Sequence, residues 1–232
     1  MAPPFVWNPS GPAPRKTEAV MKIYLAAVEE DLADAWERHC GDLPGVHIHR
    51  GSILDLEVDA VVSPANSFGF MDGGVDHLYS QHFGWEVEKR LQALIQSRHH
   101  GELLVGTAEI VETLRLPIMF VIAAPTMRVP MRLADTVNPY LAARAALLLI
   151  KYGTIPEGTF AGTAVSSIVS SVAFPGLGTG IGTVGPNTCA HQVRAAIEEV
   201  ILGKRQPPRT WAEAQQQHQL LYTDRVRDLQ RE

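Results

Sequence analysis

The sequence predicts an α/β protein with a largely parallel sheet that is covered by helices on both faces. Short apolar runs rich in valine and isoleucine alternate along the chain with longer segments whose apolar residues recur at helical spacing. Two glycine-rich segments each follow directly after one of these apolar runs. Ligands of such sheets bind at loops that leave the carboxyl ends of strands. We therefore expect the two glycine-rich segments to form a ligand site.

The composition of the 232-residue chain suits one large domain with an extension. A hydrophobic fraction of 46% allows a substantial core, and a formal net charge of −5 argues against a general nucleic-acid-binding surface, which needs a basic face. No apolar run approaches the roughly 18 to 20 residues of a membrane span. Cys40 and Cys189 lack the paired spacing of a zinc or disulfide motif, so we expect reduced, buried thiols. These features predict a cytoplasmic protein without a membrane association.

Three parts of different composition follow one another along the chain. Residues 1–18 are rich in proline, which predicts an extended arm. Residues 19–204 carry the alternating pattern and are expected to form the main domain. Residues 205–232 are expected to be a proline-bearing linker and a C-terminal helix packed on or extending from the domain.

The first elements of the main domain are three strands and one helix. The apolar run from Met21 to Val28 predicts a strand, and helix-forming residues with acids in the first turn follow from Glu29 to His39. Two more strands are expected over residues 46–53 and 57–62. The second of these is apolar at successive positions, which is typical of a strand covered on both faces.

The alternation continues to residue 202. Residues 74–98 have apolar side chains near a helical repeat, and Gly84 is expected to split this segment into two helices. The remaining predicted elements are strands over residues 105–112, 118–124 and 167–174 and helices over residues 136–152 and 187–202. A polar helix from Trp211 to Gln230 follows the linker, and Trp211 and Tyr222 would most simply anchor it by burying aromatic area, with a partner-binding arm as the alternative.

A glycine-rich loop from Pro175 to Gly185 joins the last strand to the last helix of the main domain. Its glycines let backbone N–H groups approach an anion, and the helix that follows begins with its positive end nearby. A merely tight loop is the alternative. The loop has no lysine, which excludes a Walker phosphate loop, and no later strand supplies the ribose-binding acid of a dinucleotide fold. ATPase and dehydrogenase functions are therefore not expected.

The other segment runs from Val58 to Asp76 and contains Asn66, Gly73 and Gly74. An asparagine can hold a ribose hydroxyl or a water molecule, and an aspartate can accept a proton or orient water. Taken separately, Asn66 is typical of a turn and Asp76 of a helix cap. Together, after a buried strand and around a glycine turn, they indicate a reactive site.

Three segments of the chain, in this order, resemble the ligand loops of the macrodomain family: Gly51 to Ile53, Val58 to Ser67 with the turn Gly73 to Asp76, and Pro175 to Gly182. The resemblance covers about residues 21–203. It implies a three-layer α/β/α sandwich with a mixed, largely parallel central sheet. It also implies that the protein binds ADP-ribose or an ADP-ribosylated protein, nucleic acid or small molecule, without a metal or another cofactor.

The resemblance also implies roles for particular residues. Asn66 corresponds to the asparagine that contacts the distal ribose, and Asp76 to the aspartate implicated in hydrolysis by the MacroD-like branch, which processes ADP-ribose-1''-phosphate. The two glycine-rich loops would enclose the diphosphate and the distal ribose. The expected ligand-binding residues are Ser52, Ile53, Ala65, Gly73, Gly74, Val75, Pro175, Gly176, Leu177, Gly178, Thr179, Gly180, Ile181, Gly182 and Thr183.

The chain departs from the family pattern at both ends of the expected site. Ser52 stands where the family usually has an aspartate that accepts a hydrogen bond from the adenine amino group, so we expect weaker adenine selectivity. Ser63-Pro64 replaces the usual Asn-Ala, residues 70–72 stand beside a shortened glycine run, and His77 follows Asp76 where a small residue is common. These changes are expected to reshape the end that receives the distal ribose.

The expected function is hydrolysis of an ADP-ribosyl linkage, in which a water held between the diphosphate, Asn66 and Asp76 attacks the anomeric carbon. Two alternatives are a non-catalytic reader of ADP-ribose or a related nucleotide, and a regulatory protein whose pocket binds a signalling nucleotide. Arg128 follows a strand and would meet a phosphate or a partner carboxylate, or remain solvated. His47 and His49 alternate on a strand without a third ligand in register, so no metal site is expected.

Overall fold

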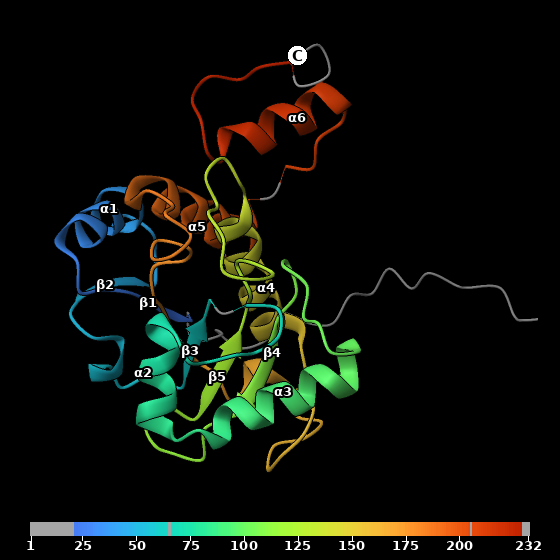
Figure 1. Cartoon of the computed structure of the whole chain (residues 1–232). Helices are drawn as coiled ribbons and strands as arrows, with labels where there is room; N and C mark the ends of the chain where they lie inside the picture. The colour runs from blue at the N-terminus through green and yellow to red at the C-terminus, as the bar shows by residue number, and fades with distance from the viewer. Residues whose placement is uncertain (1–20, 65, 205, 229–232) are drawn as a thin grey trace, which may run out of the picture.

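The computed structural model describes residues 21–64, 66–204 and 206–228, which form a sheet between two layers of helices and a C-terminal extension (Figure 1). The predicted arm at residues 1–18 and the predicted ligand residue Ala65 lie outside the described residues. The strands are β1 (Lys22–Ala27), β2 (Val46–Arg50), β3 (Ala60–Ser63), β4 (Glu109–Glu112), β5 (Phe120–Ala123) and β6 (Ser171–Phe174). The helices are α1 (Glu30–Cys40), α2 (Gly74–Phe83), α3 (Glu86–His99), α4 (Asn138–Tyr152), α5 (Pro186–Val200) and α6 (Trp211–Leu220).

The six strands form one sheet in the order β2-β1-β6-β3-β5-β4. All neighbouring pairs are parallel except β4 with β5. The largely parallel sheet predicted from the alternating pattern is therefore confirmed, and so is the mixed sheet that the resemblance implied. Because the parallel strands share one direction, the loops after β1, β2, β3, β5 and β6 all leave from the same edge.

The sheet is covered on both faces by apolar side chains. Successive residues of a strand point to opposite faces, so Ala60 and Val62 of β3 pack with α1, α4 and α5, whereas Val61 packs with α2 and α3. Every residue of β3, β4, β5 and β6 is buried. This burial explains the largely apolar sequences of β3, β5 and β6, whereas β4 carries the buried acids Glu109 and Glu112 at its two ends.

The boundaries of several elements follow from glycines. Gly84 has a φ of 93° and separates α2 from α3, as predicted. The strand predicted over residues 105–112 is confined to β4, because residues 105–108 form turns and loops around Gly106, which has a φ of 95°. The strand predicted over residues 167–174 starts late, since a short 3₁₀ helix at Val165–Ser167 precedes it.

The C-terminal helix differs from its prediction. α6 ends at Leu220, because the chain then folds back and the side-chain amide of Gln219 pairs with the backbone of Arg227 through two hydrogen bonds of 2.7 and 2.8 Å. Trp211 is 68% exposed, so the expectation that it anchors α6 by burial is wrong. Figure 1 shows α6 apart from the sheet, and His191 of α5 contacts the carbonyl oxygen of Leu220 at 3.1 Å. No helix in the described part of the chain has the length and apolar composition of a membrane span.

Candidate functional site

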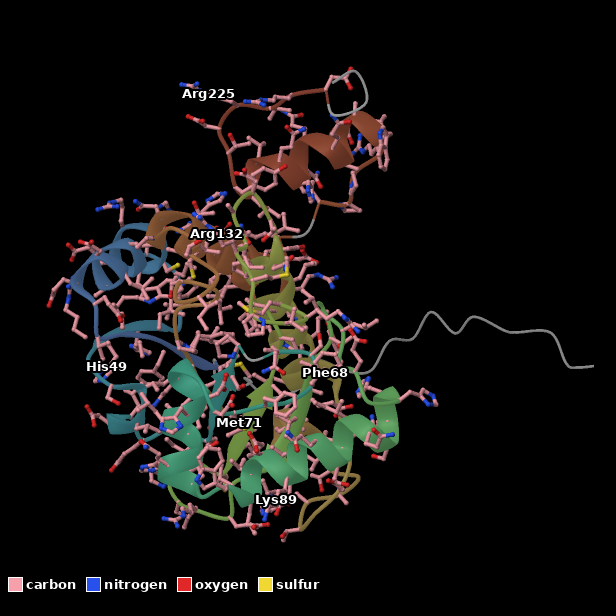
Figure 2. The ribbon with its side chains drawn as sticks, in the orientation of Figure 1. His49, Phe68, Met71, Lys89, Arg132 and Arg225 are labelled. Carbon is pink, nitrogen blue, oxygen red and sulfur yellow. The ribbon has the colours of Figure 1, made fainter. Side chains whose placement is uncertain are left out.

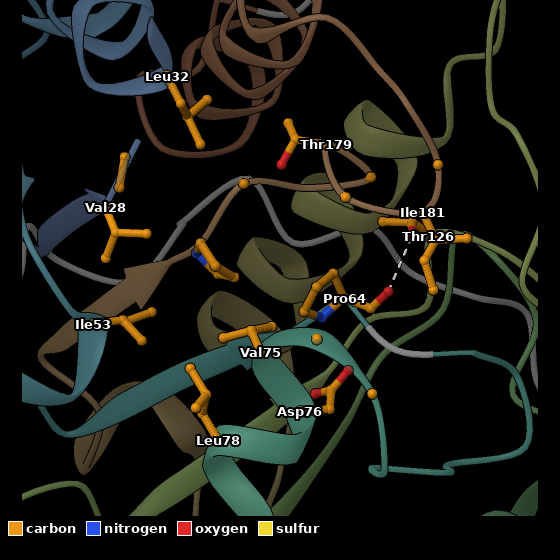
Figure 3. A pocket seen from close by; sticks show the side chains of 18 of the residues that line it. Val28, Leu32, Ile53, Pro64, Val75, Asp76, Leu78, Thr126, Thr179 and Ile181 are labelled. Carbon is orange, nitrogen blue, oxygen red and sulfur yellow. Dashed lines mark hydrogen bonds between the residues drawn. The ribbon is translucent and has the colours of Figure 1, made fainter. Parts of the chain in front are cut away.

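A cavity of about 460 Å³ opens at the carboxyl edge of the sheet (Figure 3). Its walls are segments that follow β1, β2, β3, β5 and β6, together with the first residues of α2. In Figure 3, Thr179 and Ile181 of the long glycine loop face the beginning of α2, which carries Asp76. A volume of this size is typical of a small-molecule site.

Most of the residues predicted to bind a ligand meet at this cavity. Those that line it are Ser52, Ile53, Asn66, Gly73, Gly74, Val75, Asp76, Pro175, Gly176, Gly178, Thr179, Gly180, Ile181 and Gly182. Leu177 and Thr183 do not line it. Leu177 is fully buried in the core, where it fixes the loop to the domain, and Thr183 is exposed beyond the cavity with a left-handed φ of 53°.

The long glycine loop presents unpaired donors to the cavity. Within the described chain, the backbone N–H groups of residues 178–182 have no hydrogen-bond acceptor. A Cβ atom added at Gly180 would meet nothing within 4 Å, whereas one at Gly182 would lie 2.5 Å from the carbonyl oxygen of Gly178. Gly182 is therefore needed for packing, and Gly180 leaves the backbone open to a ligand.

The described lining of the cavity contains no basic side chain. Among the residues that the structure describes, its charged lining residues are Glu29, Asp72 and Asp76. An anion in this cavity would be held by backbone N–H groups, both from the glycine loop and from the beginning of α2, where Gly73 provides no side-chain cap. The beginning of α5, which was expected to serve the same purpose, does not line the cavity.

Asp76 is a buried acid with an open hydrogen-bonding position. The residue is 6% exposed, and its Oδ1 atom has no hydrogen-bond partner among the described residues. Burial raises the pKa of the carboxyl group from 3.8 to about 7, and the nearby Ser63 hydroxyl lowers this pKa less than burial raises it. Asp76 makes no side-chain cap to α2, so the interpretation of Asp76 as a helix cap is wrong.

Asn66 has the local contacts of a turn residue and also lines the cavity. Its Oδ1 accepts the backbone N–H groups of Phe68 at 3.0 Å and Phe70 at 3.3 Å, and its Nδ2 donates to the carbonyl oxygen of Phe70 at 2.9 Å. A parallel bridge to Met127 joins the same residue to the segment after β5. The side chain of Asn66 therefore determines the shape of the loop between β3 and α2.

Ser52 lies at the opposite end of the lining, after β2. Its hydroxyl accepts the N–H of Leu54 at 3.3 Å and caps the short 3₁₀ helix Ile53–Asp55. His49 contacts the carbonyl oxygen of Ser52 at 3.1 Å, and His47 stacks on Tyr24. Over residues 21–64, 66–204 and 206–228, no three side chains of the types that bind metals come together.

The Macro domain family model matches residues 62–193, which include Asn66, Asp76 and the whole long glycine loop. The chain belongs to the Macro domain family. A protein of Aquifex aeolicus with no assigned function is 32% identical over 155 residues, which cover 67% of this chain and 80% of the relative. A Macro domain-containing protein of Mesorhizobium japonicum is 30% identical over 143 residues, which cover 60% and 68% of the two chains.

Solved macrodomains share the fold of this macrodomain. The macrodomain of Mycobacterium tuberculosis DarG superimposes with a TM-score of 0.52 and 18% identity, covering 65% of this chain and 88% of that chain. A mutant of the Oceanobacillus iheyensis macrodomain with ADPR has a TM-score of 0.52 and 22% identity, covering 65% and 75% of the two chains. The same protein has also been solved with ADP, again with a TM-score of 0.52, 21% identity and coverage of 66% and 74%.

Arg128, a candidate for a phosphate contact, and His77, which was expected to reshape the distal-ribose end, both lie outside the cavity of this macrodomain. Arg128 forms a bidentate ion pair with the carboxylate of Glu102, and its guanidinium lies 5.2 Å from the centre of the Phe68 ring. Of the outcomes expected for Arg128, the structure therefore shows pairing with a carboxylate. His77 contacts Gln81 at 2.9 Å and packs near Trp85, and it does not line the cavity. The expectation that His77 reshapes the distal-ribose end therefore receives no support from its position.

Several residues that line the macrodomain's cavity were missed in the sequence. Val28 follows β1 and Thr126 follows β5, so the rule that ligands bind at the carboxyl edge could have identified both. Phe70 and Leu78 line the cavity although their side chains are about half exposed, and no spacing pattern distinguishes them from ordinary surface residues.

Proposed function

We propose that this macrodomain binds ADP-ribose or a derivative and hydrolyses an ADP-ribosyl linkage at the distal ribose. The observation that carries the proposal is the pairing, across one cavity, of unpaired backbone donors at residues 178–182 with the open carboxylate of Asp76. The backbone donors suit a diphosphate, and the carboxylate suits a water molecule or a hydroxyl group. The presence of ADPR and ADP in structures of the Oceanobacillus macrodomain supports the choice of ligand.

The reaction follows from the two walls of the cavity. The glycine loop would hold the diphosphate, which positions the distal ribose beside Asp76. A water molecule attacks the anomeric carbon, Asp76 accepts a proton from that water, and the bond between the anomeric carbon and the acceptor breaks. The proton taken up by Asp76 then passes to the acceptor, which leaves with hydrogen in place of the ribose, and the carboxylate is restored. This is the chemistry implied by resemblance to the hydrolytic MacroD-like branch.

Asn66 serves the same end of the cavity. Its Nδ2 group has two hydrogens and uses one for Phe70, so the other is available for a ribose hydroxyl or the attacking water. We place the binding domain within residues 19–204 and regard residues 205–232 as an extension of it, because α6 makes few contacts with the domain.

A non-catalytic reader is the second candidate function. Two observations favour it: the Ser52 hydroxyl already caps a 3₁₀ helix, and both atoms of the Asn66 amide already hold a turn. A reader would use the same donors at residues 178–182 to bind the diphosphate and would leave the linkage intact. The two functions therefore differ in turnover and not in binding.

Single-turnover assays separate the two functions. Substrates carrying ADP-ribose on acidic residues, arginine, serine or nucleic acid, and acetylated or phosphorylated ADP-ribose, are incubated with the wild type and with Asp76→Ala. A hydrolase releases ADP-ribose from at least one substrate, and Asp76→Ala slows release by roughly 10²- to 10⁴-fold. If the wild type binds ADP-ribose yet releases none from any of these substrates, the reader function replaces the hydrolase.

A further inference from the structure

The loop between β3 and α2 is fixed at two points. At the first point, the Asn66 side chain makes three hydrogen bonds to the backbone of Phe68 and Phe70. Gly69 lies within this turn with a φ of 73°, and a Cβ atom there would lie 2.9 Å from the Ile95 side chain. The turn therefore packs closely on α3 and leaves no room for a side chain at Gly69.

The second fixed point is Met71. Its side chain is fully buried among residues of α2, α3 and the sheet (Figure 2), its N–H donates to Glu88 at 2.6 Å, and its carbonyl oxygen accepts from Ser80 at 2.9 Å. Phe70 stands directly between Asn66's turn and this anchor. Its backbone cannot move without breaking hydrogen bonds on both sides.

The side chain of Phe70 lines the cavity although 54% of the residue is exposed. It is the one aromatic residue among the described residues of the lining. Phe70 belongs to the same loop as Asp72 and Gly73, which leads directly into α2 and Asp76, and so lies at the end of the cavity where the distal ribose is proposed to bind. A large apolar ring that stands on a fixed backbone and is left uncovered is suited to packing against a ligand.

We propose that Phe70 is the residue that packs against the distal ribose, and that Asn66 contributes to ligand affinity as a positioning residue that holds Phe70 in place, while the remaining hydrogen of its Nδ2 group serves the attacking water during turnover. This inference rests on the proposed binding of ADP-ribose. The ring would cover the apolar C–H face of the sugar and exclude bulk water from the anomeric carbon. Asn66 would then contribute to affinity through the two hydrogen bonds that join it to Phe70.

Comparison of ADP-ribose with ADP tests the role of Phe70, because ADP lacks the distal ribose. By calorimetry, Phe70→Ala should weaken binding of ADP-ribose by about 3- to 10-fold and leave binding of ADP unchanged. Phe70→Tyr, which keeps the ring, should restore the affinity for ADP-ribose. Tyr152→Ala, which removes an exposed aromatic residue outside the cavity, is the matched control and should change neither affinity.

A double-mutant cycle tests the role of Asn66. Asn66→Ala should weaken ADP-ribose binding about as much as Phe70→Ala, and the double variant should be no weaker than either single variant, because both remove the same contact. If Asn66→Ala weakens binding just as much in the Phe70→Ala background, Asn66 touches the ligand itself and the positioning role is wrong.

Fluorescence gives a readout that is independent of affinity. In Phe70→Trp, ADP-ribose should change the emission of the added tryptophan beyond the change seen in the wild type, whereas ADP should not. If the wild type binds neither ADP-ribose nor ADP, the proposed function itself fails. If the wild type binds both, and Phe70→Ala binds both with wild-type affinity, only the inference about Phe70 is overturned.

Discussion

The carboxylate of Asp59 accepts hydrogen bonds from both the backbone N–H and the hydroxyl of Ser171, each at 2.9 Å. Ser170 donates to the same oxygen in the same two ways at 2.8 Å. Asp59 directly precedes β3 and Ser171 begins β6, which are the strands that lead into the two glycine-rich segments. This contact therefore joins the beginning of β3 to the beginning of β6, the two strands whose carboxyl ends lead into the cavity.

Loss of the Asp59 carboxylate should destabilise the fold. Asp59→Ala leaves the donors of Ser170 and Ser171 without their acceptor, which we expect to lower the free energy of unfolding by about 1–3 kcal/mol at neutral pH. Urea unfolding of the wild type and the variant measures this difference. Glu57→Ala, which removes an exposed acid two residues earlier, should have little effect.

The Asp59 contribution should also depend on pH. Burial raises the pKa of this carboxyl, but the hydrogen bonds from Ser170 and Ser171 outweigh burial, so the pKa lies below its usual value of 3.8. For an acid with a depressed pKa in the folded state, the contribution is present above the unfolded pKa and disappears as pH falls through the folded pKa. The difference between the wild type and Asp59→Ala should therefore shrink in strong acid, and a constant difference would contradict the assignment.

Asp76 should have the opposite effect on stability. Its pKa in the folded state is about 7 against 3.8 for the free side chain, so the folded protein holds a proton that the unfolded chain releases between these two values. The wild type should lose stability relative to Asp76→Asn as pH rises from 4 to about 7, because asparagine has no charge to bury. Denaturant melts at several pH values in this range give the free energy of unfolding of both proteins, and we expect the two plots of this free energy against pH to converge at low pH. Parallel plots would show that the pKa of Asp76 is not raised by folding.

The pH dependence of turnover should report the same group. A general base must be ionised, so kcat/KM of the wild type should rise with pH and level off above an apparent pKa near 7. The residual activity of Asp76→Asn should lack this rise. If the variant keeps the wild-type profile, another group sets the pH dependence and Asp76 is not the base.

Base selectivity should be relaxed at the Ser52 end of the cavity. A serine hydroxyl offers a neutral hydrogen bond where a carboxylate would offer a charge-assisted one, so discrimination against other bases should be weaker by about 1 kcal/mol. Inosine and guanosine analogues should compete measurably with ADP-ribose, and Ser52→Asp should reduce this competition. Strict adenine selectivity that persists in Ser52→Ala would assign base recognition to another residue.

The sequence predicted the order of elements and the meeting of the two glycine-rich segments, because the apolar alternation determines which strand ends share an edge. Gly84 marked the division between α2 and α3, because the conformational freedom of a glycine is a property of that residue alone and can be recognised in the sequence. The direction of individual side chains was not predictable. Leu177 packs in the core and Phe70 lines the cavity, and the tertiary structure that separates the two side chains is not encoded in any local pattern.

The tail gives the clearest case of a local pattern that failed. Helix-forming residues continue beyond Leu220, but the bonds between Gln219 and Arg227 turn the chain back and end α6. Likewise, Trp211 was expected to be buried because it is large and apolar, yet it remains on the surface. Both outcomes depend on tertiary contacts that composition does not specify.

Calorimetric titration of ADP-ribose into the wild type and into Gly180→Val tests the central claim, that the backbone of the long glycine loop binds the diphosphate. A side chain at Gly180 meets no protein atom within 4 Å and requires no left-handed backbone, so the variant should fold normally while its side chain blocks the anion from the donors. Gly185→Val adds the same side chain just outside the cavity and should bind as the wild type does. The account predicts one site in the wild type and at least a tenfold loss of affinity in Gly180→Val. Equal affinity in the two proteins, or no binding by the wild type at millimolar ADP-ribose, would contradict it.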